Sequence, residues 1–212
     1  MSDTPIDVFI DLPYSPGPVQ AGRLWSHFRK GRESASFEYN REWLANPYRF
    51  ALEPLLPLAD GTFHTTPGQS VFGAIGDSTP DRWGRILMRR AELVRARAAN
   101  ESPRTLSELD YLLRVNDEAR QGALRFSQDG GQSFCAPPGA TPIPPLVNLS
   151  RLLHAADHFC RDDENAEDLR LLLAPGSSLG GARPKASVKD KKGNLCIAKF
   201  PRYDDEYNVV AW

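Results

Sequence analysis

Alternation of apolar and polar residues in the first part of the chain predicts a small sheet. Three short runs have the apolar and aromatic residues, and the period of two, that are typical of strands. A short helix is expected to begin at Arg41. The proline-bearing run 47–57 is expected to be a loop or an edge segment, because proline cannot donate to a strand ladder. The predicted strands cover residues 8–12, 22–28 and 35–39.

Helical spacing of apolar residues is clearest after Pro80. Ser78 or Thr79 would cap this helix, and Pro80 suits its first turn. Asp81 would favour the positive end of the helix dipole. One face of the helix is therefore expected to be buried, and that face carries Trp83, Ile86, Leu87, Ala91 and Val94.

A second helix is expected from about residue 103, with Thr105 and Glu108 spaced as a capping box. A polar turn then leads into a predicted strand at residues 122–126. The core stripe of this helix would consist of Leu106, Leu109, Leu112 and Leu113.

Composition changes at residues 127–145, which are rich in Gly, Pro, Ser and Gln and have no apolar period. Such a composition is typical of a loop or linker. Two helices, at 146–159 and 167–173, and then a strand hairpin are expected to follow. The predicted fold class is therefore α+β. The predicted divisions are a small strand-rich subdomain with helices at residues 1–128, a Gly/Pro-rich linker at 129–145 and a smaller unit at 146–212.

Length, charge and cysteine usage exclude several classes of protein. The 212 residues suffice for one large or two small domains, and a net charge of -1 excludes a strongly basic nucleic-acid-binding protein. No apolar run approaches the roughly 20 residues of a membrane span, and the first residues lack the pattern of a signal peptide. The scattered Cys135, Cys160 and Cys196 argue against a disulfide framework, so a cytoplasmic protein without a membrane partner is predicted.

A stripe of arginines follows the helix after Pro80 and mostly avoids its apolar face. Such a stripe would contact DNA phosphates or an acidic partner. The alternative is a solvated face whose arginines pair with acids elsewhere in the fold. The candidate contact residues are Arg82, Arg85, Arg89 and Arg90, and only Glu92 opposes the positive charge in this interval.

Two histidines four residues apart, His154 and His158, do not predict a metal site. Zinc would need further ligands at recognisable spacing, and a catalytic zinc helix would carry a glutamate between the histidines. The chain also lacks the G-x-S-x-G elbow of a serine hydrolase. Neither chemistry is therefore predicted.

The glycine-rich stretch before Lys185 has the composition of a phosphate-binding turn. Gly180 and Gly181 lack a Cβ, so the backbone can adopt positive φ and bring N–H groups close to a ligand oxygen. Arg183 and Lys185 add positive charge, and Lys199 stands at the end of the following apolar strand. In kinases a glycine-rich loop covers the phosphates while a strand lysine reaches them. An ordinary loop between a helix and a hairpin has the same composition, and this alternative stays open.

Three stretches together resemble the HipA-like serine/threonine kinases, the toxins of bacterial type II toxin–antitoxin modules. They are DSTPDRWGR at residues 77–85, YLLRVND through GALRF at 111–126, and SLGGARPK with IAKFP at 178–201. The resemblance spans roughly residues 5–212 and implies that the last unit is part of a kinase-like N-lobe. It implies an ATP-binding set of Gly180, Gly181, Ala182, Arg183, Pro184, Lys185 and Lys199, with Ser178 or Ser177 as the autophosphorylation site.

The same resemblance implies cofactors and partners for the complete kinase. These are ATP and Mg²⁺, a helix-turn-helix antitoxin of the HipB type, operator DNA reached through that complex, and a protein substrate of translation. In the family, the catalytic aspartate and the magnesium-binding acid lie in a helical C-lobe downstream of the strand lysine, and no residue of this chain is assigned to either role.

We therefore expect the N-terminal portion of a HipA-like kinase, inactive alone and separated from its C-lobe by a split gene, by design or by proteolysis. The C-lobe would act in cis or in trans. The alternative is a non-catalytic regulatory fragment that binds an antitoxin or DNA.

Overall fold

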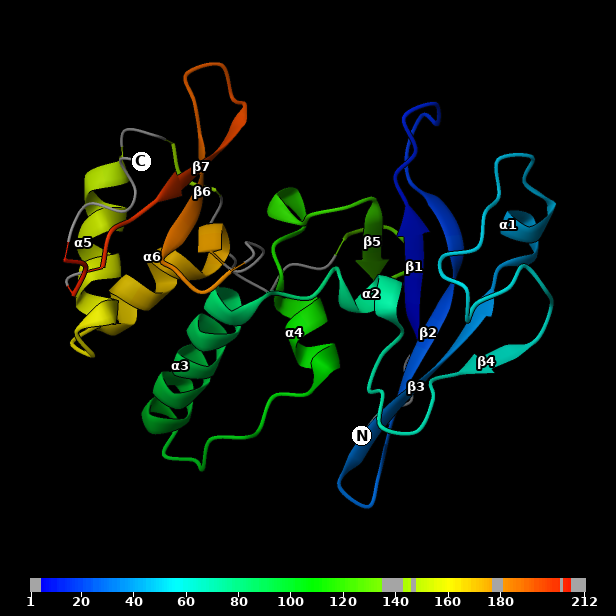
Figure 1. Ribbon diagram of the computed structural model, residues 1–212, viewed down its shortest axis with the longest axis horizontal. Helices are drawn as coiled ribbons and strands as arrows, with labels where there is room; N and C mark the ends of the chain where they lie inside the picture. Colours follow the sequence, from blue (N-terminus) through cyan, green and yellow to red (C-terminus); the bar gives the residue numbers. More distant parts are fainter. Residues whose placement is uncertain (1–4, 135–142, 146–147, 177–180, 203, 207–212) are drawn as a thin grey trace. The chain divides into compact units, whose positions relative to one another are not determined.

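The computed structural model describes residues 5–134, 143–145, 148–176, 181–202 and 204–206, and the fold is mixed α+β (Figure 1). Contacts between Cα atoms divide the chain into two units. Unit 1 contains Met1–Thr79, Ser107–Leu113 and Gln121–Cys135, and unit 2 contains Pro80–Leu106, Arg114–Arg120 and Ala136–Trp212. The domain boundaries predicted from composition stay a prediction, and the contacts group residues 80–106 with unit 2.

Unit 1 is built on a five-stranded antiparallel sheet with the strand order β4-β3-β2-β1-β5 (Figure 1). The three strands predicted in the first part of the chain are present. The first begins and ends two residues earlier than predicted, and the second and third are longer than expected. The strand predicted after residue 122 forms an edge. β1 lies inside the sheet, where Val8 pairs with Gly22 of β2 and with Phe126 of β5. The bounds are β1 Ile6–Ile10, β2 Val19–Arg29, β3 Arg32–Tyr39, β4 Thr62–His64 and β5 Leu124–Ser127.

The core of unit 1 forms where apolar strand residues meet three short helices. All five residues of β1 are buried, as expected for a strand inside a sheet with both faces covered. The helices are α1 at Arg41–Ala45, α2 at Gly73–Gly76 and α4 at Glu108–Arg114. The largest fully buried side chains of this core are Trp43, Phe37, Phe72 and Phe126.

The N-terminus of α4 corrects the capping box predicted from the sequence. Thr105 and Glu108 do not form it. Instead the Ser107 N–H donates to Asp110 Oδ2 at 3.0 Å, and the Asp110 N–H donates to Ser107 Oγ at 3.1 Å. The N–H of Glu108 donates to the Glu33 carboxylate, at 2.9 Å. The capping box therefore lies two residues later than expected, and the helix begins at Glu108, where the Glu33 carboxylate satisfies its first-turn donors.

Unit 2 packs three helices against a two-stranded hairpin. These are α3 at Arg82–Ala98, α5 at Leu149–Cys160, α6 at Ala166–Gly176, β6 at Lys185–Lys189 and β7 at Leu195–Lys199, and a 3₁₀ turn, η1, lies at Asp117–Ala119. α6 contacts α3, α5 and β6. No helix in the described ranges is long and apolar enough to cross a membrane.

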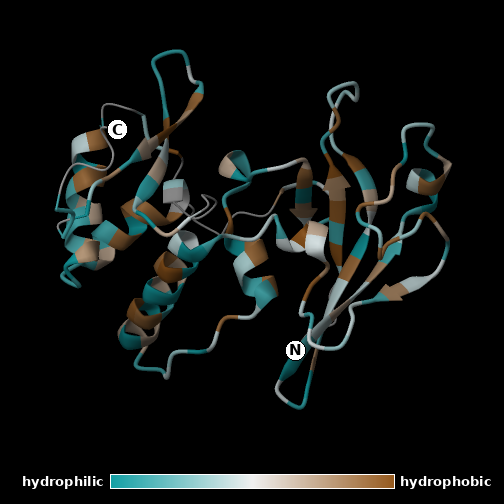
Figure 2. Cartoon of the chain, in the orientation of Figure 1, coloured by the Kyte–Doolittle hydropathy of each residue, from teal (hydrophilic) through white to brown (hydrophobic). Residues whose placement is uncertain are grey.

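The hairpin of unit 2 has one buried face. Ala186 and Val188 of β6 enter a core with Leu152, Phe159 and Leu172. Most of β7 is exposed, and Figure 2 shows its apolar residues beside the hydrophilic turn that joins the two strands. The hairpin predicted for this part of the chain is therefore present, with Ala186 and Val188 packed on the helices.

His158 joins the end of α5 to the start of α6. Its Nδ1 lies 3.0 Å from Asp168 Oδ2. Asp168 and Asn165 also form a capping box, in which the backbone N–H of each donates to the side-chain oxygen of the other. The hydrogen bond to Asp168 raises the pKa of His158, and burial of the imidazole opposes this. Burial of Asp168 would raise its own pKa, but the bonds from His158 and Asn165 bring that pKa below its usual value.

We predict that the stability of unit 2 falls as pH rises through the raised pKa of His158. The protonated imidazole stabilises the fold fully below the unfolded-state value of 6.5, and this contribution is lost above the folded-state pKa. Urea unfolding of the whole chain between about pH 6 and about pH 9 measures the loss. The His158→Gln variant should lack this part of the slope, whereas His154→Gln should retain it. An unchanged slope in His158→Gln contradicts the prediction.

We also predict that Gly22→Ala destabilises unit 1 by about 2 kcal/mol, because overpacking forces a backbone shift. A Cβ at Gly22 would lie 2.2 Å from the Glu38 carbonyl oxygen and 2.5 Å from Phe37 Cζ. Urea unfolding followed by circular dichroism measures the change. Gly17→Ala is the matched control, because nothing lies within 4 Å of its added Cβ, and equal effects of the two substitutions would refute the steric account.

Candidate functional site

The structure brings together two of the stretches that carry the resemblance. At the start of α3, the Gly181 N–H donates to Asp81 Oδ2 at 2.6 Å, across 100 residues of sequence. In return, the Trp83 N–H donates to the Gly181 carbonyl oxygen at 3.0 Å. The Trp83 indole N–H donates to the Lys185 carbonyl oxygen at 2.9 Å. The N-terminus of α3 therefore holds both Gly181 and the first residue of β6.

Asp81 is the N-cap of α3, which corrects the expectation that Ser78 or Thr79 caps this helix. Its backbone is extended, and its Oδ1 accepts the Arg82 N–H at 2.9 Å. The Thr79 hydroxyl donates instead to the Gly76 carbonyl oxygen. The hydrogen bond from Gly181, followed by that from Arg82, lowers the pKa of Asp81, so this carboxylate is ionised at neutral pH.

Gly181 has the backbone geometry that a tight approach to a ligand requires. Its φ is +82°, in the left-handed region that favours glycine, and an added Cβ would lie 2.9 Å from Lys185 Nζ. Within the described ranges, no acceptor is bonded to the N–H groups of Ala182 and Arg183, which follow on the exposed side of the loop. The Lys185 ammonium group therefore lies beside a glycine of the loop, and two backbone donors follow that glycine in sequence.

Two lysines face each other across the open end of the hairpin. The antiparallel register pairs Lys185 of β6 with Lys199 of β7. Burial lowers the pKa of Lys185, Asp81 opposes this shift, and the charge of Lys199 adds to it. Lys199 is exposed and forms no ion pair with any residue of the described ranges. Like charges directly opposite each other destabilise a strand pair, so this end of the hairpin attracts an anion.

Arg183 and Pro184 are held in place by the segment after β7. Arg183 Nη1 donates to both carboxylate oxygens of Asp205, each at 2.8 Å, and the carbonyl oxygen of the buried Pro184 accepts the Phe200 N–H at 3.0 Å. Only 10% of the Asp205 side chain is exposed. The sequence indicates a solvated acidic turn at residues 204–206. Asp205 departs from that expectation because Arg183 compensates its charge.

The remaining predicted site residues, Ser177, Ser178 and Gly180, lie outside the described residues. The donors that are described fit phosphate oxygens, because they combine a positive-φ glycine with lysine ammonium groups. Among the residues that the structure describes, no group of three or more His, Cys, Asp and Glu side chains could hold a metal ion, so no ligand is assigned to Mg²⁺.

The candidate DNA-contacting arginines of α3 differ in their surroundings. Arg90 forms ion pairs with Glu164 and Asp162 and lies over the Phe159 ring, 5.6 Å from its centroid. Arg85 Nε donates to the Pro80 carbonyl oxygen at 2.8 Å. Two others, Arg82 and Arg89, are exposed. Arg90 thus pairs with acids of unit 2, as the solvated-face alternative expects, whereas the hydrogen bond from Arg85 Nε is to a backbone oxygen.

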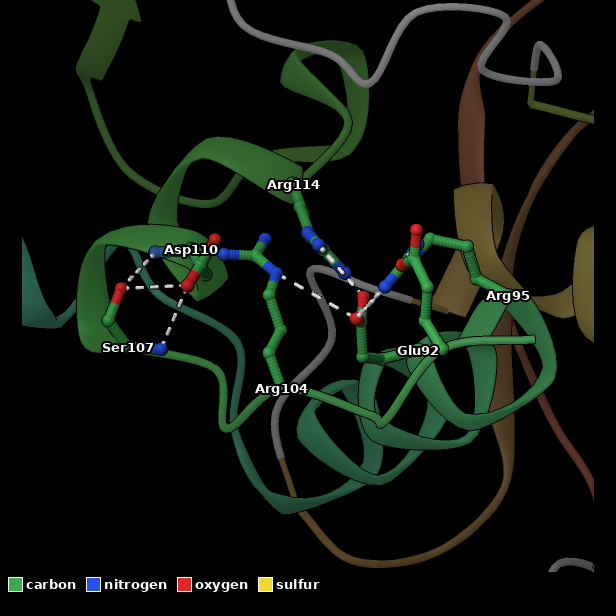
Figure 3. A network of polar contacts seen from close by, with 7 residues as sticks. Glu92, Arg95, Arg104, Ser107, Asp110 and Arg114 are labelled. Carbon is green, nitrogen blue, oxygen red and sulfur yellow. Dashed lines mark hydrogen bonds and ion pairs between the residues drawn. The ribbon is translucent and has the colours of Figure 1, made fainter. Parts of the chain in front are cut away.

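Glu92 is buried on α3 within a cluster of arginines (Figure 3). Its side chain is 2% exposed, and its carboxylate lies 2.8 Å from Arg95, 3.3 Å from Arg114 and 3.7 Å from Arg104. The hydrogen bond from Arg95 lowers its pKa more than burial raises it. The sequence places this acid among the polar residues of α3, but the arginines allow it to be buried as a charged group.

No protein-family model matches this chain, and a search of curated proteins found no match. The functional argument therefore rests on the residues and contacts of the chain itself.

We predict that Glu92→Gln lowers the free energy of unfolding by about 2 kcal/mol, because it leaves three guanidinium groups around a neutral amide. Chemical denaturation of the whole chain measures the loss. Glu101→Gln is the matched control, since Glu101 pairs with the same Arg95 but its side chain is 58% exposed, and it should cost less than about 1 kcal/mol. Similar losses in both variants would mean that burial of Glu92 is not the cause.

Proposed function

We propose that the loop and hairpin at residues 181–199 bind the phosphates of ATP, and that this chain contributes the site to a HipA-like protein serine/threonine kinase. The observation that carries the proposal is the pairing of Lys185 with Lys199 beside the positive-φ Gly181. Like charges directly opposite each other destabilise a strand pair, and a bound anion would offset this repulsion. A polyphosphate carries several negative charges and is long enough to contact both ammonium groups.

The chemistry of phosphoryl transfer agrees with this assignment. Positioning and electrostatic stabilisation supply most of the catalysis, and the phosphates must be held by backbone donors and a lysine. Lys199 would take the role of the strand lysine, and residues 180–185 that of the phosphate-covering loop. ATP supplies the transferred phosphoryl group, while the catalytic aspartate and the magnesium ligand belong, in this proposal, to a kinase C-lobe.

Regulation and partners follow from the same proposal. Phosphorylation of Ser178 or Ser177 would add about two negative charges beside the ATP phosphates, so nucleotide would be repelled. A helix-turn-helix antitoxin and a protein substrate of translation are the partners that the resemblance suggests. The alternative of a DNA-contacting regulatory fragment has no specific contact in its favour, because Arg85 and Arg90 are engaged within unit 2.

We predict that the chain binds ATP with magnesium and that Lys199→Ala weakens this binding at least about tenfold, the scale of one lost charge-assisted contact. Isothermal titration calorimetry measures both affinities. Lys192→Ala is the matched control, because Lys192 is an exposed lysine of the same hairpin at its far turn.

The control should bind ATP as the unmodified chain does. Equal affinity of the unmodified chain and Lys199→Ala, or loss of binding in both lysine variants alike, would reject Lys199 as the phosphate-pairing residue.

A further inference from the structure

The carboxylate of Asp81 is bonded to the loop that the proposed function assigns to the phosphates. Its Oδ2 accepts the Gly181 N–H at 2.6 Å, and its charge acts on the Lys185 ammonium. The same Nζ lies 2.9 Å from the point where a Gly181 Cβ would stand. A backbone N–H and an ammonium group at one glycine are suitable donors for an anion. Here the Asp81 carboxylate, in the same unit, already accepts the N–H and acts on the charge of the ammonium group.

The two oxygens of this carboxylate have separate partners. Oδ1 accepts the Arg82 N–H at 2.9 Å as the helix cap, while Oδ2 alone bonds Gly181. Release of Gly181 would therefore leave the cap of α3 intact. Two further bonds, from the Trp83 N–H to Gly181 and from the Trp83 indole to Lys185, would still hold the loop on the helix. An exchange of anions at Gly181 is thus a local event.

We infer that Asp81 is an internal competitor of the bound phosphate: its carboxylate accepts the Gly181 N–H, and a polyphosphate must displace it to bind. The inference rests on the proposed function, because only an anion that enters this loop competes with Asp81. Asp81 thereby sets the affinity of the loop for phosphate. With Asp81 in place, an empty loop keeps its donor satisfied and the charge of Lys185 balanced.

The test removes the charge of Asp81 and keeps its shape. In Asp81→Asn the amide oxygen can still cap α3, since asparagine is as good an N-cap as aspartate. ATP and inorganic pyrophosphate should each bind about three- to fivefold more tightly to this variant, the scale of one exposed charge contact. Asp163→Asn, an exposed aspartate of the same unit, should bind both ligands as the unmodified chain does. The double variant Asp81→Asn with Lys199→Ala should bind both ligands more weakly than Asp81→Asn alone.

A second measurement uses the unmodified chain and so does not depend on how a variant folds. Saturation with pyrophosphate should raise the pKa of Asp81, read from its carboxyl carbon by NMR, because the carboxylate loses the Gly181 bond and gains a negative neighbour. A pKa of Asp81 that does not change on binding would overturn the inference.

The outcomes separate the inference from the proposed function. Binding by the unmodified chain that depends on Lys199, with no tightening in Asp81→Asn, overturns the competition and leaves the ATP site. Binding that is tighter in Asp81→Asn than in the unmodified chain and depends on Lys199 supports both. Absence of binding in every variant rejects the proposed function and the competition with it.

Discussion

The buried Trp83 side chain is the connection on which unit 2 and its candidate site both depend. Its ring packs edge-on against Phe159, with centroids 5.1 Å apart, in the core that α5 and α6 share with β6. Its indole N–H reaches the Lys185 carbonyl oxygen, and its backbone N–H reaches Gly181. Apolar packing therefore fixes the position of Trp83, and the hydrogen bonds from Trp83 in turn fix the position of the loop. A loop fastened in this way approaches a ligand without the entropy cost of ordering a free loop.

Charged side chains occur in two different arrangements in unit 2. Where a carboxylate is buried, several donors compensate it: arginines surround Glu92, and His158 and Asn165 bond Asp168. At the mouth of the hairpin the excess is positive and lies near solvent, with Lys185 opposite Lys199. The first arrangement holds helices and loops together, because removal of one partner leaves a charge in a poor solvent. The second does little for the fold, which is why it points to a ligand.

The sequence was sufficient for those features that depend on neighbouring residues. All strands of the sheet except β4, all helices except the short α2, and the final hairpin follow from apolar periods and turn residues, and the structure has them. It was not sufficient for β4, whose three residues are too few for a period, or for the caps. The cap of α4 was misplaced because Glu33, from a distant strand, satisfies its first donors. Asp81 was expected only to favour a helix dipole, because its contact with Gly181 lies 100 residues away.

The candidate site was predictable by residue type but not by arrangement. Glycine and lysine in this order indicate phosphate chemistry, whereas the facing of Lys185 and Lys199 depends on the register of β6 and β7. The far turn fixes that register, since Asp190 and Asn194 pair through their backbones and Gly193 adopts a φ of +85°. A slip of one residue would put Ala198 opposite Lys185 and turn Lys199 towards the helices. The charge at the mouth of the hairpin is therefore set by turn chemistry at its other end.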